Sequence, residues 1–250
     1  GLGYTILTGE KNGIRAQQEL FVPRGDACEI DRLTLENKTD APRTLDVFSY
    51  VEFCLWDAMD DSSNFQRNFS TGEVEVVGSA IYHKTEYRER RDHYAVFWAN
   101  TPVTSFDTSR DAFCGVYGGP AEPEAVKAGH CSNSVAHGWA PVGAHHFHLT
   151  LEAGETKTIL FGLGYIENPV AEKFTAPGVI NKARAEAMMA RYATDAQVDE
   201  ARKALAAHWD DLLSALQLDS GDEKLDRMVN LWHQYQCMVT FNMSRSASYY

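Results

Sequence analysis

The sequence has few cysteines, no excess of positive charge and no long apolar run. Its five cysteines are odd in number and scattered over 250 residues, without a CxxC pair. A disulfide scaffold normally carries denser, even-numbered cysteines, so this pattern favours reduced thiols and a cytoplasmic protein.

Charge and hydropathy also argue against nucleic acid or a membrane as a partner. The net charge is −12 at pH 7, which repels phosphate-rich surfaces. The longest apolar stretches, such as residues 95–99 and 159–161, fall far short of the roughly 20 residues that cross a bilayer. No signal peptide is visible. The first residue is not Met and the last lies soon after a patterned helix, so we expect a segment of a longer protein.

Residues 3 to about 167 show the period-two alternation of half-buried strands. Turn-forming residues separate nine such segments. The segments are residues 4–10, 14–23, 29–37, 43–53, 72–77, 80–87, 93–100, 145–151 and 157–166. Many short strands with few helices predict a large antiparallel β-sandwich domain over residues 1–167.

The pattern changes to helical spacing in the last third of the chain. One helix is predicted from Val179, in a stretch rich in Ala, Met, Arg and Glu. A second is predicted over residues 196–216, with Thr194 or Asp195 as its cap. Together they make a helical linker over residues 168–220.

A third helix is predicted over residues 222–242, with a wide apolar and aromatic stripe. The stripe comprises Leu225, Met228, Val229, Trp232, Tyr235, Gln236 and Val239. A stripe this wide predicts that residues 221–250 begin a larger helical body.

Three polar stretches have a structural explanation that we favour over a chemical one. The histidines of HHFH at 145–148 could bind zinc, since His146 and His148 share a strand face, but no further ligand is evident. We therefore expect no metal.

The charged residues 82–97 have mixed signs, which favours an ion-pair network over an anion site. The carboxylates near residue 60 lack an identifiable partner for glycoside chemistry, which favours solvated turn acids.

The segment NFQRNF at 64–69 sets Arg67 between Phe65 and Phe69. A guanidinium offers a fixed fork of hydrogen-bond donors, and aromatic faces cover the C–H faces of a sugar. From composition alone, the favoured alternative is a loop that the phenylalanines anchor, with Arg67 paired to a nearby aspartate.

Five stretches, in order, resemble the cellobiose phosphorylases, which belong to a family of inverting disaccharide phosphorylases. They are YVEFCLWDAMDD, NFQRN, GSAIYHKTEYRERRDHYAVF, LGYIENP and DEKLDRMVNLWHQYQCMVTFNMSRSAS. The resemblance covers essentially the whole chain. It implies a β-sandwich, a helical linker, a catalytic α/α toroid and a C-terminal jelly roll, with the last helix here as the first, incomplete part of the toroid.

The resemblance implies reversible phosphorolysis of cellobiose to α-D-glucose 1-phosphate and D-glucose, with inversion. Phosphate is already an anionic nucleophile, so one aspartate acting as general acid suffices. The resemblance places that aspartate beyond residue 250, so no catalytic residue is assigned in this chain. Inorganic phosphate is the co-substrate, and no cofactor is implied.

The resemblance also implies a homodimer in which a sandwich loop reaches the active site of the neighbouring subunit. The position that matches an arginine contacting the acceptor sugar is Arg67, with Phe65 and Gln66 shaping the same wall. Arg245, in NMSRSAS, is a candidate near the donor sugar, and a purely structural arginine is its alternative.

Two other functions remain open at this point. A laminaribiose or cellodextrin phosphorylase of the same family would differ in how the acceptor is held. A non-catalytic carbohydrate-binding or dimerisation module would explain the same surface residues without turnover.

Overall fold

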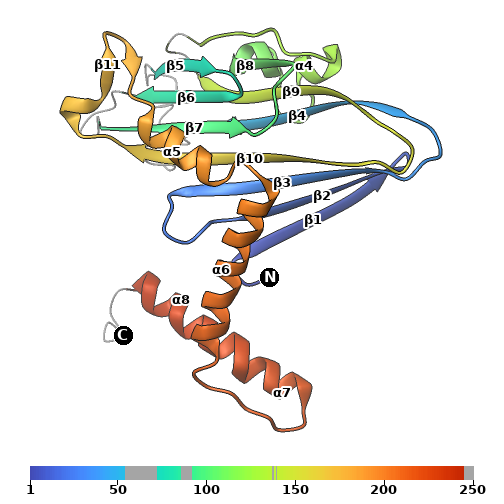
Figure 1. Ribbon diagram of the computed structural model, residues 1–250, viewed down its shortest axis with the longest axis vertical. Coiled ribbons are helices and arrows are strands. Elements are labelled where there is room, and N and C mark those ends of the chain that lie inside the picture. Colours follow the sequence, from blue (N-terminus) through green and yellow to red (C-terminus); the bar gives the residue numbers. More distant parts are fainter. Residues whose placement is uncertain (54–71, 86–91, 137, 139, 245–250) are drawn as a thin grey trace.

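The computed structural model describes residues 1–53, 72–85, 92–136, 138 and 140–244. It is a β-sandwich followed by helices (Figure 1). The strands are β1 (Tyr4–Lys11), β2 (Ile14–Phe21), β3 (Cys28–Asn37), β4 (Arg43–Glu52), β5 (Gly72–Val77), β6 (Ala80–Thr85), β7 (His93–Ala99), β8 (Ser105–Ser109), β9 (Pro141–Leu151), β10 (Thr156–Glu167), β11 (Phe174–Ala176) and β12 (Val179–Ile180).

Two antiparallel sheets of unequal width form the sandwich. Among the described residues, the larger sheet has the order β1-β2-β3-β10-β7-β6-β5 and the smaller one β4-β9-β8. Their facing side chains form an apolar core that includes Ile81, Phe97, Phe147 and Phe161. The alternation of apolar and polar residues sets which face each strand buries. The nine predicted strand segments and the predicted sandwich are confirmed.

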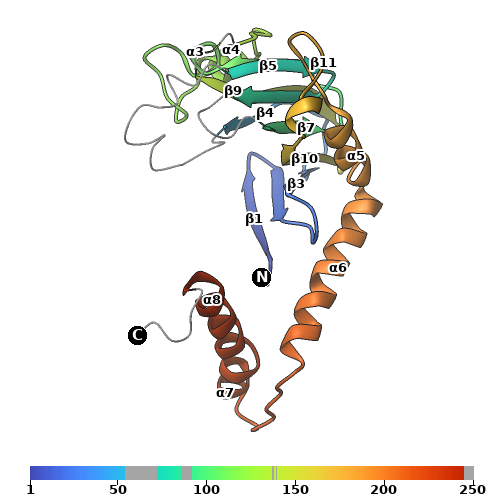
Figure 2. The ribbon, with the colours of Figure 1, turned by 90° about the vertical axis from the view of Figure 1, so that its left-hand side faces the viewer.

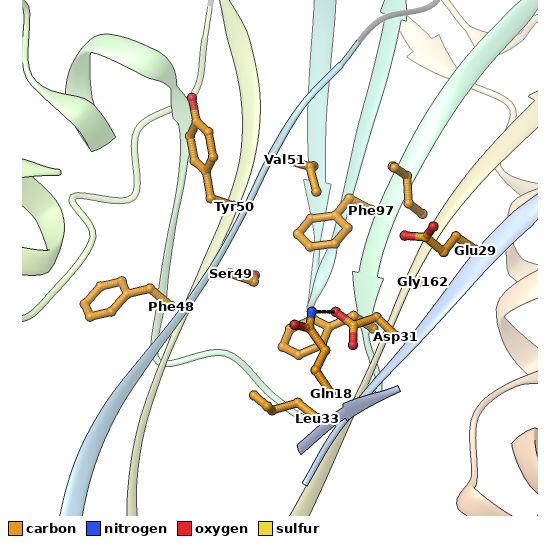
Figure 3. Close-up of a pocket in the computed structure, with 12 residues that line it drawn as sticks. Gln18, Glu29, Asp31, Leu33, Phe48, Ser49, Tyr50, Val51, Phe97 and Gly162 are labelled. Carbon is orange, nitrogen blue, oxygen red and sulfur yellow. Dashed lines mark hydrogen bonds between the residues drawn. The ribbon is translucent and has the colours of Figure 1, made fainter. Parts of the chain in front are cut away.

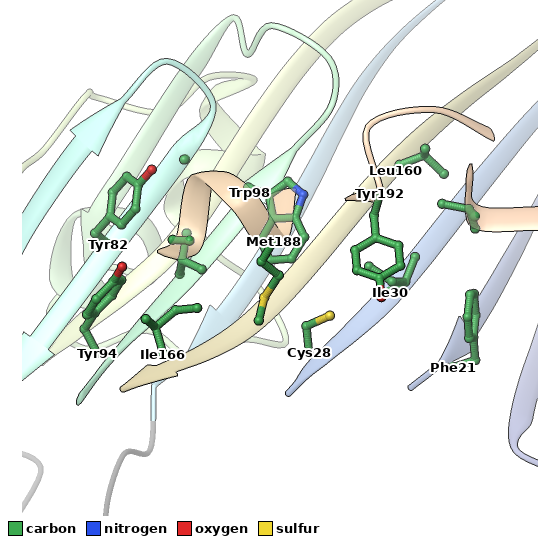
Figure 4. Close-up of a cluster of buried hydrophobic side chains, with 14 of the residues drawn as sticks. Phe21, Cys28, Ile30, Tyr82, Tyr94, Trp98, Leu160, Ile166, Met188 and Tyr192 are labelled. Atoms are coloured by element: carbon green, nitrogen blue, oxygen red, sulfur yellow. The ribbon is translucent and has the colours of Figure 1, made fainter. Parts of the chain in front are cut away.

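Helices α5 (Ala183–Arg191) and α6 (Asp195–Leu213) pack on the outer face of the larger sheet. Their buried side chains join a second apolar core, in which Met188 and Tyr192 lie over the strands (Figure 4). Arg202 and Asp199 of α6 bind Glu19 and Arg32 of the sheet, at 3.3 Å and 2.6 Å respectively. Helices α5 and α6 are therefore fixed to the sandwich by both apolar and ionic contacts.

A close approach of backbone and aromatic ring explains the glycines in FGLGY of β10. Gly162 lies opposite Trp98 of β7, and a Cβ on Gly162 would come within 2.1 Å of the Trp98 ring. The indole therefore lies directly over β10, beneath Met188 of α5 (Figure 4).

Two short helices, α3 (Arg110–Cys114) and α4 (Glu124–Ala128), cover the outer face of the smaller sheet. Phe113 of α3 stacks on Tyr50 of β4 with ring centroids 4.9 Å apart. The four described cysteines are free thiols, in accordance with the prediction.

The chain leaves the sandwich through α6 and folds back in a last helical segment (Figure 2). It comprises α7 (Glu223–Arg227), a π-helical stretch over Met228–His233 and α8 (Gln234–Ser244). The segment touches α6 through the rings of Trp209 and Tyr235, which lie 5.7 Å apart. The expected apolar stripe is largely exposed, with Trp232 54% accessible.

Three local predictions were incomplete or wrong. The first linker helix begins at Ala183 rather than Val179, because residues 179–180 pair with β11 in a short hairpin. A 3₁₀ turn over Val170–Glu172 precedes that hairpin. Strand β8 and the helices α3 and α4 were not predicted.

No helix in the described ranges is long and apolar enough to span a membrane.

Candidate functional site

The residues that the sequence predicts as sugar contacts lie outside the described part of the chain. They are Phe65, Gln66, Arg67 and Arg245. The carboxylates near residue 60 and the charged residues 86–91 lie outside it as well. The structure does describe both flanks of the segment 54–71, and these flanks define where the predicted loop leaves and rejoins the sandwich.

Both flanks of the segment 54–71 meet at strand β6. Before the segment, the ring of Phe53 stacks on the imidazole of His83, with centroids 5.0 Å apart and an interplanar angle of 28°. After the segment, β5 pairs with β6 so that Val74 lies opposite His83. His83 therefore neighbours residues from both ends of the segment.

Phe53 and His83 are both buried in the core between the two sheets. They are 7% and 3% exposed. Burial and, to a smaller degree, the nearby His93 and Lys84 lower the pKa of His83 to about 4. The imidazole is therefore neutral at pH 7 and packs as a flat ring.

The next strand, β7, extends this aromatic group. His93 is buried, and its ring centroid lies 5.5 Å from that of Tyr165 on β10. The Tyr165 hydroxyl donates to Glu167 Oε1 at 2.7 Å. We call Phe53, His83, His93 and Tyr165 the loop-base cluster, since they lie at the end of the sandwich where the segment 54–71 begins.

A second anchor holds the end of β4 on the opposite side of the strand. The carboxylate of Glu52 accepts hydrogen bonds from the Tyr50 hydroxyl at 2.7 Å and from Arg110 Nε at 3.3 Å. The backbone just before the segment 54–71 is thus held by Glu52 on its outer face and Phe53 on its inner face.

A cavity of about 320 Å³ lies between the sheets beside this site (Figure 3). Its polar groups come mainly from one wall, where Gln18 Nε2 donates to Asp31 Oδ2 at 2.6 Å. Burial raises the pKa of Asp31, opposed by the Gln18 hydrogen bond and reinforced by Glu29. The facing wall is mostly apolar, and its Ser49 hydroxyl already bonds His145 at 3.2 Å. One such wall does not supply the two-sided polar contacts that a sugar needs.

A neighbouring cavity of about 400 Å³ runs up to Phe53 and the loop-base cluster. Its lining is largely apolar and includes Ala95, Leu163 and Tyr165. The two cavities share Glu29 and Leu163 as lining residues and are therefore adjacent.

The histidines of residues 145–148 take part in structural contacts. His145 faces the core, where burial lowers its pKa to about 3. His146 and His148 share a face, as predicted, and both bond the same oxygen of Asp46, at 2.9 Å and 2.8 Å. These bonds lower the pKa of Asp46. In the described part of the chain, no three His, Cys, Asp or Glu side chains are arranged to hold a metal.

The charged stretch 82–97 is described only at its two ends. Lys84 is 2% exposed, and its ammonium lies 4.8 Å from the centre of the Phe174 ring. At the other end, Asp92 Oδ1 lies 3.6 Å from His93 Nδ1. Lys84 and His93 are buried, whereas residues 86–91, which carry most of the predicted ion-pair network, lie outside the described residues.

Comparison with known families assigns both parts of the chain. Residues 1–195 match the glycosyl hydrolase 94 supersandwich domain. Residues 208–250 match the catalytic domain of the glycosyl hydrolase 94 superfamily. The chain therefore belongs to glycosyl hydrolase family 94, whose N-terminal supersandwich it contains.

Curated relatives include several phosphorylases. The chain is 32% identical over its whole length to N,N′-diacetylchitobiose phosphorylases of Vibrio furnissii and Vibrio proteolyticus, and it spans 29% of each. It is 32% identical over 63% of its length to solabiose phosphorylase of Paenibacillus borealis, of which it spans 21%. Among solved structures, a putative kojibiose phosphorylase from the human microbiome shares the fold, with a TM-score of 0.51 and 13% identity over 83% of this chain and 23% of that one.

The sequence predicts Arg67 as a sugar contact, which stays a prediction, and it did not predict the packing of Phe53 and His83 next to the segment 54–71. The stacking of Phe53 on His83 joins a residue just after β4 to a residue of β6, 30 positions further along the chain and in the other sheet. Alternation in "AIYHKT" does place His83 on the inner face, since it shares that face with Ile81. That periodicity was the available signal.

Proposed function

We propose that this chain is the N-terminal part of a cellobiose phosphorylase. The observation that carries this proposal is the ordered match of a family 94 supersandwich domain, over residues 1–195, followed by a match to the family's catalytic domain over residues 208–250. The names of three curated relatives, all disaccharide phosphorylases, support the reaction class. The sugar is proposed from the resemblance of the five stretches to cellobiose phosphorylases.

The proposed reaction is reversible phosphorolysis of cellobiose to α-D-glucose 1-phosphate and D-glucose. Phosphate attacks the anomeric carbon from the face opposite the leaving glucose, so the configuration inverts. The glycosidic bond breaks and its electron pair leaves with the oxygen, which an aspartate beyond residue 250 protonates. Phosphate is the only co-substrate required, and no cofactor takes part.

Within this chain, Arg67 is proposed to contact the acceptor sugar across the interface of a cytoplasmic homodimer. Phe65 and Gln66 shape the same wall, and Arg245 lies toward the donor sugar. A guanidinium suits this task because it can donate two parallel hydrogen bonds to neighbouring hydroxyls. The anchored backbone at Glu52 and Phe53 supports the role, since a contact that crosses an interface requires a fixed starting point.

The sugar specificity is tested with the full-length protein and phosphate. Release of glucose 1-phosphate from cellobiose is compared with release of the sugar 1-phosphate from laminaribiose, a cellodextrin and N,N′-diacetylchitobiose. We expect cellobiose to give the highest kcat/KM of the four sugars. A preference for one of the other sugars, or no activity on cellobiose, would overturn it.

N,N′-diacetylchitobiose is the second candidate substrate. It is favoured by the 32% identity to two phosphorylases of that sugar over the whole chain. The two candidates differ by the acetamido groups on the sugar, so the same assay separates them.

A non-catalytic carbohydrate-binding module is the remaining alternative for the 250 residues alone. With the general acid placed elsewhere, we expect the isolated chain to be inactive and to bind disaccharides weakly or not at all. Millimolar or tighter binding of cellobiose by a monomer, measured by calorimetry, would favour the module instead.

A further inference from the structure

We propose that a chain of four alternating charges sets the position of α6 on the larger sheet and, through α6, the position of the last helical segment. The charges are Arg202, Glu19, Arg32 and Asp199, which we call the α6 ion chain. They lie at the joint between the supersandwich and the residues that match the catalytic domain. Their positioning role does not depend on which sugar the protein cleaves.

The sheet supplies the two inner charges of the α6 ion chain. Glu19 of β2 and Arg32 of β3 lie directly opposite each other in register. Glu19 Oε2 accepts from Arg32 Nε at 3.2 Å and from Arg32 Nη2 at 2.5 Å. The two side chains are only 10% and 22% exposed, respectively. The sheet therefore presents a fixed negative group beside a fixed positive group to the helix.

Helix α6 supplies the two outer charges. Asp199 and Arg202 are three positions apart, so they lie on one face of the helix. Asp199 Oδ1 lies 2.6 Å from Arg32 Nη1, and Arg202 Nε lies 3.3 Å from Glu19 Oε1. The Arg202 guanidinium also lies over the Tyr4 ring of β1, 3.6 Å from its centre. The helix is thus held at three neighbouring strands.

The apolar contacts of α6 hold the helix on the sheet without fixing its place along it. Val198 and Leu205 are buried in the second apolar core, with Ala201 and Trp209 packed beside them. Apolar side chains recur along such a helix every three or four residues, so a slide by one turn would bury similar groups. The charges remove this freedom, because only one placement gives each of them a partner of opposite sign.

The last helical segment is bound to the end of α6 (Figure 2). Gln234 Nε2 donates to the carbonyl oxygens of Leu213 and Leu216, at 3.2 Å and 2.8 Å. Asn230 exchanges two hydrogen bonds with the backbone of Leu218, at 2.7 Å and 2.8 Å. A change in the place of α6 therefore moves this segment with it.

The test measures a distance in the full-length protein by electron–electron double resonance. Spin labels are attached at the exposed Val77 of β5 and Lys224 of α7 through a genetically encoded ketone amino acid, which leaves the cysteines untouched. The paired change Glu19→Arg with Arg32→Glu keeps the cross-strand pair but sets like charges against α6. We expect the mean separation of the labels to move by about 5 Å, one helical turn, or its distribution to broaden.

Reversing the helix charges as well restores the alternation of signs. Adding Asp199→Arg and Arg202→Asp to the sheet variant should return the distance distribution to that of the native protein. An unchanged distribution in the sheet variant would overturn the proposal, even if its Tm falls, because the charges would then only stabilise the fold. A fourfold variant that does not recover the native distribution would overturn it too.

Glu200→Lys with Lys203→Glu is the matched control on the same helix. These two residues pair with each other at 2.7 Å, and their side chains are 73% and 71% exposed. Their reversal does not touch the sheet and should leave the label separation unchanged. A shift as large as that of the sheet variant would show a general effect of helix charge and would refute a specific role of the α6 ion chain.

A milder variant keeps the test available if the sheet variant does not fold. Asp199→Asn with Arg202→Gln neutralises the helix charges and leaves Glu19 paired with Arg32. We expect this variant to broaden the distance distribution. A distribution identical to that of the native protein would show that the apolar contacts alone position α6.

Discussion

At the residue scale, the structure describes the buried rings of the loop-base cluster, whereas the predicted sugar contact Arg67 lies outside the described residues. Arg67 stays a prediction, made from its neighbours in sequence and from the family resemblance. The rings of Phe53 and His83 could not be paired from the sequence, because Phe53 follows β4 of the smaller sheet, His83 lies on β6 of the larger sheet, and nothing local connects them. His146 and His148 share a face of β9, as predicted, but their common bond to the Asp46 carboxylate was not predicted.

Replacing Arg67 with alanine should raise the KM for the acceptor glucose more than the KM for phosphate. Loss of a charge-assisted hydrogen bond costs about 1.5–3 kcal/mol, which corresponds to roughly a 10- to 150-fold rise in acceptor KM. The measurement is the glucose dependence of synthesis by the full-length enzyme. An unchanged glucose dependence would exclude Arg67 from the acceptor site.

The buried histidines should make the sandwich less stable in acid. Burial depresses the pKa of His83 to about 4 and of His145 to about 3, from an ordinary value of 6.5. As pH falls below about 6.5 the unfolded chain takes up protons that the folded chain does not, so unfolding is favoured. Each histidine contributes a slope of up to about 1.4 kcal/mol per pH unit, down to its folded pKa.

Urea denaturation of the chain between pH 7 and pH 4.5 measures this slope. The variant His145→Phe should lose stability less steeply than the native chain over that range. Parallel curves for the two proteins would contradict the assignment of His145 as a neutral buried ring.

At the scale of secondary structure, strongly alternating segments were predictable and short or weakly patterned ones were not. Strand β8 has the sequence SFDTS, and its polar residues Ser105, Asp107 and Thr108 are buried. Hydrogen bonds satisfy these side chains, so the strand lacks the apolar alternation that would have predicted it. Val179 and Ile180 continue a helical composition but pair with β11, since tertiary pairing overrides propensity over two residues. The last helix was predicted as uniform, whereas its middle is π-helical.

The helix α6 should depend measurably on its N-terminal cap. The hydroxyl of Thr194 accepts from Gln197 N at 3.4 Å, and Thr194 N donates to Gln197 Oε1 at 3.0 Å. Thr194→Ala removes the side-chain half of this capping box and should cost about 1 kcal/mol. Thr194→Ser keeps the hydroxyl and serves as the control.

Thermal denaturation compares the two variants. Equal Tm values for Thr194→Ala and Thr194→Ser would show that the cap does not stabilise α6. Catalytic parameters of the full-length enzyme should be the same for both, since Thr194 lies away from the loop-base cluster.

At the scale of the whole molecule, the order of parts was the most secure inference from sequence. Alternation followed by helical spacing predicted a sandwich and then helices, and the structure confirms that order. The unequal width of the two sheets was not predictable, because alternation gives the buried face of a strand but not its neighbours. The last helical segment, in which Trp232 is exposed, lies within residues 208–250, which match the family's catalytic domain.

The central claim is that the full-length protein cleaves a disaccharide only when phosphate is present. The most direct measurement incubates the full-length protein with cellobiose, with and without phosphate, and identifies the products. The account predicts α-D-glucose 1-phosphate and glucose by NMR, with no cleavage in phosphate-free buffer. Hydrolysis to two free glucose molecules without phosphate, or a β-configured sugar phosphate, would contradict it.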